Sequence, residues 1–127
     1  MGTFARPIIV YSPSGEQPVT LDALVDSGAT YSMIPGPVLE SLRIQPVREM
    51  HFLLADERVI RKHIAEVAVE VEGRRTTTWC IFGDAGSTAL LGAYILEGLQ
   101  LAIDPYGKRL VPLTGYLMPL LRDDGTL

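Results

Sequence analysis

The order of apolar and polar positions predicts a chain built mainly of short strands. Residues 4–11 contain a β-branched run, which favours an extended conformation. In residues 19–25 every second side chain is apolar, and this period of two predicts a strand with one buried face. Turn-forming residues at 12–15 lie between the two segments. Together they predict a β-hairpin that ends at Asp26.

A short helix and a long hairpin are predicted for the middle of the chain. Residues 31–34 predict a short strand, and Pro37 suits the first turn of a helix that ends near Arg43. Residues 47–55 and 59–71 predict two longer strands with a polar turn between them.

The remaining third of the chain continues the same pattern. It predicts a turn followed by strands around one further helix: a turn at 73–75, strands at 76–82, 99–103 and 109–111, and a helix at 93–97. Many short strands with two short helices indicate an all-β fold that is closed or folded over on itself. We expect one domain over residues 1–127, with a core at about residues 6–112 and an apolar tail at 113–127.

Composition and charge narrow the class of protein. A chain of 127 residues has room for one modest core, and a net charge of −4 gives no general attraction to nucleic acid or anionic membranes. The apolar region at residues 89–103 is interrupted and too short to cross a bilayer. Cys80 is the only cysteine, so no intrachain disulfide can form, and beside Trp79 it is most simply a packed core thiol. No signal-peptide pattern opens the chain, and we expect a cytoplasmic protein.

The candidate chemistry lies at the end of the first hairpin. Asp26, Ser27 and Gly28 are residue types of solvated turns, yet they lie between two apolar segments. A carboxylate at the end of a buried strand loses hydration, which costs free energy unless its charge is compensated or shared. Such sites are candidates for function. The alternative is a structural turn in which the Asp26 side chain binds nearby backbone N–H groups.

These residues carry a resemblance to a known family. An apolar pair followed by Asp26-Ser27-Gly28-Ala29 resembles the signature of the retropepsin-like aspartic proteases at every position. A second match is Leu90-Leu91-Gly92, which is followed by a predicted helix as in that family. Residues 98–105 also look like the small prokaryotic members. The resemblance covers about residues 6–112 and implies a closed β-barrel half-lobe with one or two short helices.

Peptide hydrolysis by carboxylates needs two of them around one water, one as general base and one as proton donor. The sequence offers one convincing motif, so we expect a twofold homodimer in which Asp26 of each subunit meets at the axis. The resemblance implies the same arrangement for an aspartic endopeptidase acting on extended polypeptides, with no metal or cofactor. It also implies that Ser27 binds across the axis, that Gly28 allows close approach, and that Ala29 and Thr30 line the floor.

The long hairpin resembles the flap that closes over a peptide in this family. Its tip, Ala55-Asp56-Glu57-Arg58, is therefore a candidate substrate-binding segment. Most relatives carry a glycine in this tip, and here Glu57 replaces it, which predicts a stiffer or more acidic flap. In retroviral relatives the chain ends build the dimer interface. The apolar residues 113–121 are candidates for that role by strand pairing across the axis.

Other interpretations compete with catalysis at Asp26. Asp84 begins a loop that could hold a second catalytic carboxylate, but no apolar strand pair precedes it, and a surface loop is the simpler interpretation. His51 and His63 lack a ligand cluster at metal spacing, so a zinc site is not expected. A phosphorylation-dependent degron at residues 26–32 would need an exposed, disordered segment, which the apolar flanks disfavour.

Two further hypotheses concern the whole chain. One is a retropepsin-like domain that serves dimerisation or peptide binding without turnover, which the unusual Glu57 favours. The other is a small β-domain with no peptide site. A protein that is monomeric at all concentrations would favour it.

Overall fold

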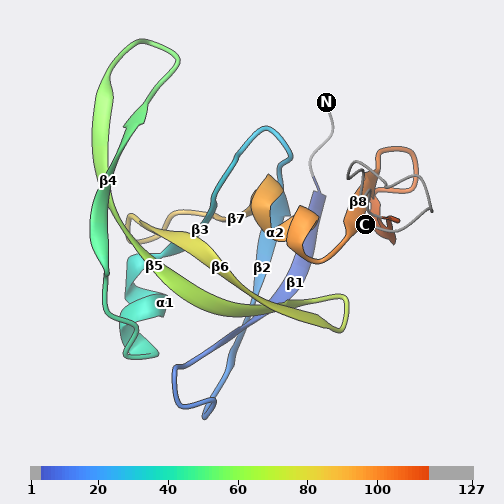
Figure 1. The fold of residues 1–127 in the computed structure, drawn as a ribbon, viewed down its shortest axis with the longest axis horizontal. Coiled ribbons are helices and arrows are strands. Elements are labelled where there is room, and N and C mark those ends of the chain that lie inside the picture. The colour runs from blue at the N-terminus through green and yellow to red at the C-terminus, as the bar shows by residue number, and fades with distance from the viewer. Residues whose placement is uncertain (1–3, 115–127) are drawn as a thin grey trace, which may run out of the picture.

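The computed structural model describes residues 4–114, which form nine strands and two short helices (Figure 1). The strands are β1 (Phe4–Tyr11), β2 (Val19–Val25), β3 (Ser32–Pro35), β4 (Arg48–Leu53), β5 (Val59–Val71), β6 (Arg74–Gly83), β7 (Ala89–Leu91), β8 (Leu101–Asp104) and β9 (Arg109–Pro112). The helices are α1 (Gly36–Ser41) and α2 (Ala93–Gly98). The predicted positions of both helices are confirmed to within a residue or two.

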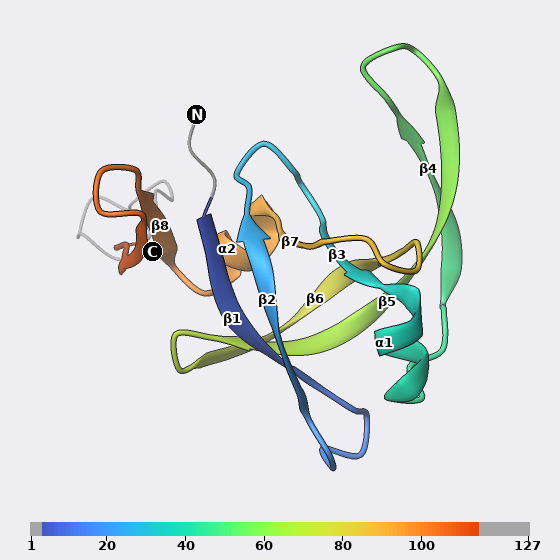
Figure 2. The same cartoon turned by 180° about the vertical axis from the view of Figure 1, so that it is seen from behind.

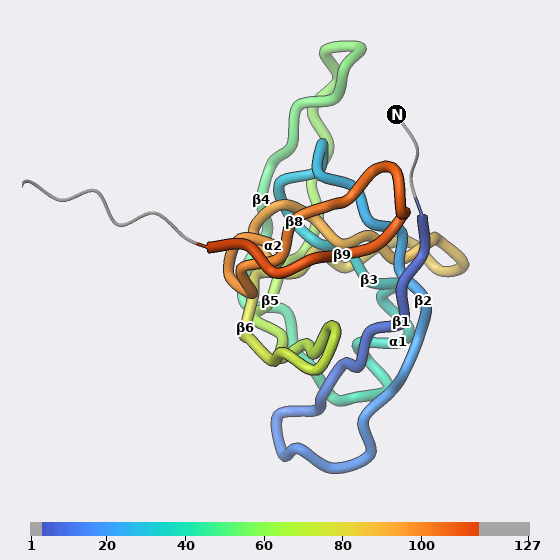
Figure 3. Tube along the Cα trace, turned by 90° about the vertical axis from the view of Figure 1, so that its right-hand side faces the viewer, coloured from blue at the N-terminus to red at the C-terminus, as the bar shows by residue number. Residues whose placement is uncertain are grey.

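Six of the strands form a closed barrel. They follow the order β1-β2-β7-β3-β6-β5, and a further pairing between β1 and β5 closes the ring. The β2–β7 and β3–β6 pairs are parallel, whereas β1–β2, β3–β7 and β5–β6 are antiparallel. Figure 3 shows the strands arranged around this ring, with the β4–β5 hairpin extending beyond it. The predicted all-β, closed fold is confirmed.

The first hairpin forms as the alternation predicts. Strands β1 and β2 pair from Phe4 with Val25 to Val10 with Val19. Ala23 and Val25 are buried, whereas Thr20 on the other face is exposed. The hairpin therefore turns one apolar face toward the barrel interior, and Asp26 follows directly at the end of β2.

Polar side chains support the seam that closes the barrel between β1 and β5. The Tyr11 hydroxyl donates a hydrogen bond to Glu70 at 2.9 Å, and this bond raises the pKa of Tyr11. The guanidinium of Arg75 lies 3.8 Å from the centre of the Tyr11 ring, in cation–π geometry. These contacts join β1 to β5 and β6 on the outside of the ring.

Both helices pack one apolar face against the barrel. Pro37 lies in the first turn of α1, as predicted, and Leu39 is fully buried while Leu42 just after the helix is 5% exposed. In α2 the buried side chains are Ile95 and Leu96. Figure 2 shows that the two helices lie apart from one another, so each covers a different part of the barrel.

The prediction of a turn over residues 73–75 is wrong. Both Glu72 (φ 52°) and Gly73 (φ 76°) have positive φ, which is typical of a two-residue type I′ hairpin turn. Because this turn matches the twist of the strands, pairing resumes at once, with Val71 opposite Arg74. Arg74 and Arg75 thus belong to β6, and the Arg74 side chain donates to the Leu99 carbonyl at 2.7 Å.

The second strand pair, β8–β9, begins two residues later than the predicted strand at 99–103. The N–H of Leu99 still donates to the Ile95 carbonyl and that of Gln100 to Glu97, so the helical turn continues. Beyond β9, Leu113 donates its N–H to the Gln100 carbonyl. Most of the predicted interface segment, residues 115–121, lies outside the described residues, so its role stays a prediction.

Candidate active site

The Asp26 loop (residues 26–31) begins where buried strand β2 ends. Val25 is 2% exposed, and the next residue, Asp26, donates its backbone N–H to the Leu91 carbonyl at 3.0 Å. The Ala29 N–H then donates back to the Asp26 carbonyl at 3.2 Å, which forms a tight turn. The backbone of Asp26 is therefore fixed by β7 on one side and by its own loop on the other.

The Asp26 carboxylate is half buried and points one oxygen into its own turn. Oδ1 accepts the N–H of Gly28 at 2.9 Å, which is the structural turn that competed with catalysis in the sequence. This bond orients the carboxylate and leaves Oδ2 without a protein partner among residues 4–114. Ser27, Gly28 and Thr30 are exposed and Ala29 is half buried. A structural turn and a catalytic site would both hold an oriented carboxylate on an exposed loop, so this geometry fits either interpretation.

The Asp26 loop is hydrogen-bonded to the first turn of helix α2. Ala93 donates its N–H to the Ala29 carbonyl at 2.7 Å, and Tyr94 donates to the Thr30 carbonyl at 3.1 Å. These N–H groups belong to the first turn of the helix, where no intrahelical acceptor exists. The two sequence motifs, near residues 26 and 91, are thus brought into direct contact.

Gly92 marks the tightest point of this junction. A Cβ at that position would lie 2.6 Å from the Tyr31 carbonyl group and 2.8 Å from the Ala29 oxygen. Only a glycine lets the two backbones approach so closely. The glycine of the second motif therefore has a packing reason in this structure.

The flap hairpin (residues 48–63) stands out from the barrel, as Figure 1 shows. At its tip Leu54 and Arg58 close a three-residue loop, with the Leu54 N–H donating to the Arg58 carbonyl at 2.8 Å. The Asp56 carboxylate accepts from the backbone N–H of Arg58 and from its Nε at 2.6 Å. Glu57 has a φ of 69°, the left-handed conformation that glycine adopts more easily.

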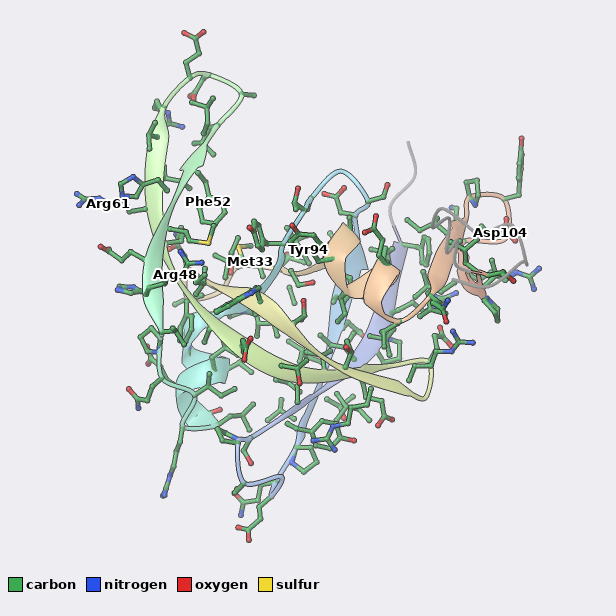
Figure 4. All side chains as sticks on the ribbon, viewed as in Figure 1. Met33, Arg48, Phe52, Arg61, Tyr94 and Asp104 are labelled. Atoms are coloured by element: carbon green, nitrogen blue, oxygen red, sulfur yellow. The ribbon has the colours of Figure 1, made fainter. Side chains whose placement is uncertain are left out.

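The predicted substrate-binding residues 55–58 all lie at this exposed tip. The contact between the hairpin and the Asp26 loop is made lower down, by Phe52 on β4. The Phe52 and Tyr31 rings meet edge to face with centroids 5.7 Å apart. Tyr31 also meets Tyr94 of α2 at 5.3 Å. Figure 4 shows Phe52 pointing toward the side of the molecule that carries Met33 and Tyr94.

The sequence reasoning missed this aromatic cluster of Tyr31, Phe52 and Tyr94. Each is a single aromatic residue in a different segment, and nothing local indicates that they meet. One usable signal was the alternation in β4, which places Phe52 on the same face as the half-buried Met50 and opposite the exposed His51.

The competing candidates fall elsewhere. Asp84 lies on the exposed loop between β6 and β7 and binds Lys62. His63 and Glu49 face each other on the outer face of the flap, 3.9 Å apart. Among residues 4–114 no three His, Cys, Asp or Glu side chains are grouped as a metal site, and no helix there is long and apolar enough to cross a membrane. A surface hollow between the β1–β2 turn and α1 includes none of the Asp26 loop residues.

Cys80 is confirmed as a packed core thiol. Its side chain is fully buried in β6, and this burial raises its pKa to about 12. A thiol with so high a pKa is a poor nucleophile, because the thiolate is the reactive form. Cys80 is therefore not a candidate nucleophile.

Comparison with known proteins supports the fold. No family model and no curated protein matches the sequence. Among solved structures, the chain is similar to simian foamy virus protease (19% identity, 76% of this chain and 94% of that one, TM-score 0.55). It is also similar to EIAV protease complexed with the inhibitor HBY-793 (18% identity, 77% and 88%, TM-score 0.57).

A third similar structure is the retroviral protease-like domain of Ddi1 from Leishmania major (21% identity, 88% of this chain and 89% of that one, TM-score 0.58). The chain has a retropepsin-like fold. The resemblance to small prokaryotic members stays a prediction.

Proposed function

We propose that this protein is an aspartic endopeptidase that works as a twofold homodimer. Asp26 of each subunit contributes one carboxylate, and the pair activates a single water for attack on a peptide bond. The observation that carries this proposal is the anchoring of the Asp26 loop to the β7–α2 junction within a retropepsin-like fold. That junction fixes the loop backbone while leaving the loop surface open to a partner and a substrate.

The proposed chemistry follows from the behaviour of two carboxylates at close range. Two like charges a few ångströms apart cannot both ionise easily, so the pair shares one proton. The ionised member removes a proton from the water, and the protonated member donates its proton toward the substrate carbonyl oxygen. The Gly28 N–H, which binds Asp26 Oδ1, holds the carboxylate in position for this exchange. Activity at acidic to near-neutral pH is expected, and a maximum above about pH 9 would contradict the dyad.

The proposed substrate is an extended polypeptide that lies between the flap hairpin and the Asp26 loop. Among residues 4–114, strand β4 pairs with β5 on one side only, so its other edge can bind an added strand through its backbone groups. The inner face of the hairpin carries Met50, Phe52 and Ile60, which are half buried. Ser27, Ala29 and Thr30 on the floor and residues 55–58 at the tip complete the proposed site.

The decisive experiment compares wild type with Asp26→Asn on an unfolded protein substrate, between about pH 3 and pH 8, by mass spectrometry. Asparagine keeps an oxygen for the Gly28 N–H, so the fold should survive while cleavage disappears. Asp22→Asn is a matched control, because Asp22 is an exposed carboxylate on β2, the strand that leads to Asp26. Cleavage by wild type and the control alone supports the proposal, and cleavage retained by pure Asp26→Asn would sink it.

A mixing experiment tests the homodimer. When wild-type and Asp26→Asn subunits are mixed equally and allowed to exchange, only dimers with two Asp26 carboxylates are active. A dimeric site then predicts about a quarter of the wild-type activity, whereas a site within one chain predicts about half. Sedimentation at several concentrations gives the subunit state independently.

The alternative function is a dimerisation or peptide-binding module without turnover. The left-handed Glu57 at the flap tip favours it, since a strained tip resists the movements that turnover needs. A folded dimer that binds peptides without cleaving them would support this alternative. A monomer at every concentration would favour the simple β-domain. The one-domain organisation, the interface role of residues 113–127 and the cytoplasmic location are further predictions.

A further inference from the structure

The flap hairpin continues into the barrel sheet through β5, while residues 42–47 connect its other strand, β4, to helix α1. Within the described residues β4 pairs with β5 alone, and β5 continues into the barrel, where it pairs with β6. The β5–β6 ladder ends at the pair Ile64 and Ile81. Beyond that pair, toward the tip, the position of the hairpin depends on side-chain contacts with the body of the protein.

An ion pair spans the point where the hairpin leaves the barrel. Lys62 lies two residues beyond the end of the ladder, and its Nζ is 2.7 Å from Oδ1 of Asp84. Asp84 comes directly after the end of β6 at Gly83. The Lys62 side chain is 24% exposed, so the ammonium group is partly withdrawn from water, whereas Asp84 is 84% exposed. The pair thus continues the contact between these two chain segments beyond the last ladder pair.

The other ion pairs of the hairpin are internal to it. Arg58 binds Asp56 within the tip, and His63 faces Glu49 across the β4–β5 ladder. Neither pair restrains the hairpin relative to the barrel. In the described part of the chain, Lys62–Asp84 is the ion pair that connects the flap to the body. Two further side-chain contacts connect the hairpin to the body: Tyr31–Phe52, nearer to Asp26, and the Arg48 guanidinium, 5.6 Å from the centre of the Trp79 ring of β6.

We propose that Lys62 and Asp84 are positioning residues that hold the flap hairpin over the Asp26 loop. The ion pair sets the angle at which the hairpin leaves the barrel, and that angle brings Phe52 against Tyr31. The expected change in KM rests on the proposed peptidase function. The expected change in the Tyr31–Phe52 contact does not. Because the pair is partly exposed, its loss should weaken substrate binding about two- to five-fold rather than abolish it.

The kinetic test uses an uncharged peptide that contains one of the wild-type cleavage sites. Lys62→Met should raise KM about two- to five-fold with a smaller change in kcat, and Asp84→Ala should do the same. The double variant should be no worse than either single variant, because both remove one interaction. Lys62→Arg keeps the charge and should restore most of the wild-type KM.

Arg61→Met is the matched control. Arg61 is an exposed cation on the neighbouring residue of β5, and Figure 4 shows it pointing away from the barrel. Its loss changes net charge equally but leaves the Lys62–Asp84 contact intact, so KM should not change. Added salt screens an exposed pair, and it should raise KM for wild type and Arg61→Met but not for Lys62→Met. Equal KM values for Lys62→Met and Arg61→Met would overturn the proposal.

A structural measurement separates this proposal from the peptidase proposal. Magnetisation transfer between the Tyr31 and Phe52 rings in nuclear magnetic resonance spectra reports their contact without any substrate. The signal should weaken in Lys62→Met and Asp84→Ala and persist in Arg61→Met. If wild type proves inactive but the signal behaves in this way, the positioning role stands and the peptidase fails. An unchanged signal in the well-folded, exposed-site variant Asp84→Ala would refute the positioning role whatever the activity.

Discussion

The buried hydroxyl of Ser32 accepts the backbone N–H of Gly92 at 3.0 Å, which joins the first residue of β3 to the residue before helix α2. Ser32 is 2% exposed, the buried polar side chain of the described core. The bond crosses 60 residues of sequence and lies directly beneath the contact between the Asp26 loop and α2. It therefore supports the geometry of the candidate site from inside the fold.

Replacing Ser32 by alanine should destabilise the protein. The Gly92 N–H would remain buried with no acceptor, and an unsatisfied buried donor costs about 1–3 kcal/mol. Urea unfolding at equilibrium measures this loss. Ser41→Ala is the control, since the Ser41 hydroxyl donates to Val38 on the exposed end of α1 and should contribute less than about 0.5 kcal/mol. Equal unfolding midpoints for Ser32→Ala and Ser41→Ala would contradict the importance of the buried bond.

Replacing Gly92 by alanine should be more damaging still. The new methyl would meet backbone atoms of Tyr31 and Ala29 at 2.6–2.8 Å, and neither can move without shifting the Asp26 loop. We expect a loss of about 1–3 kcal/mol or more, together with loss of any cleavage activity. Gly98→Ala serves as the control, because a Cβ there meets nothing closer than 3.9 Å. Thermal unfolding and the cleavage assay on both variants decide the matter; a Gly92→Ala protein with wild-type behaviour would show that the junction is adaptable.

Elements with a local cause could be predicted from the sequence. The β1–β2 hairpin follows from alternation that ends at Val25, and helix α1 follows from Pro37 and apolar residues at helical spacing. The Asp26 motif and Leu90-Leu91-Gly92 were each visible as motifs. That the two motifs meet could not be seen in the sequence, because their contact depends on hydrogen bonds between distant segments, such as that from the Asp26 N–H to the Leu91 carbonyl.

Features that depend on contacts distant in sequence could not be predicted. The closure of the barrel pairs Ile9 with Glu70, and no local pattern specifies that partner. The Tyr31–Phe52 contact and the Lys62–Asp84 pair have the same origin, because each needs the hairpin and the barrel to be placed first. The error at residues 73–75 is different in kind: a two-residue turn was hidden because Glu72 is not a typical residue for positive φ.

Replacing Glu57 by glycine should relieve strain at the flap tip. A left-handed conformation costs a non-glycine residue about 1–2 kcal/mol, and the extra entropy of an unfolded glycine offsets about 0.4–1 kcal/mol of the gain. A small net stabilisation is expected in thermal unfolding. Lys108 has a similar positive φ of 50° in the β8–β9 turn, so Lys108→Gly should show the same effect on stability.

The two glycine variants should differ in function. If the tip contacts substrate as proposed, Glu57→Gly changes KM for peptide cleavage and Lys108→Gly leaves it at the wild-type value. A kinetic effect shared by both variants would show that stability, and not the flap tip, is responsible.

The high pKa of Cys80 predicts how stability responds to alkaline pH. Burial raises this pKa from 9.0 to about 12, because the thiolate is disfavoured inside the barrel. Below about pH 9 the thiol is neutral in both the folded and the unfolded chain, so its contribution to stability is constant. Between about pH 9 and 12 the unfolded chain ionises first, and folding loses about 1.4 kcal/mol per pH unit from this group.

Cys80→Ala isolates this effect from the other groups that titrate at high pH. Its free energy of unfolding should fall less steeply than that of wild type as the pH is raised from about 8 to 10.5, so the gap between the two proteins narrows. In the folded wild type the thiol should also react with a disulfide reagent at pH 8 only at the rate of unfolding, because the thiolate is scarce and covered. Rapid reaction of the native protein, or parallel pH profiles for wild type and Cys80→Ala, would mean that the β6 thiol reaches water in solution and that the barrel opens on that side.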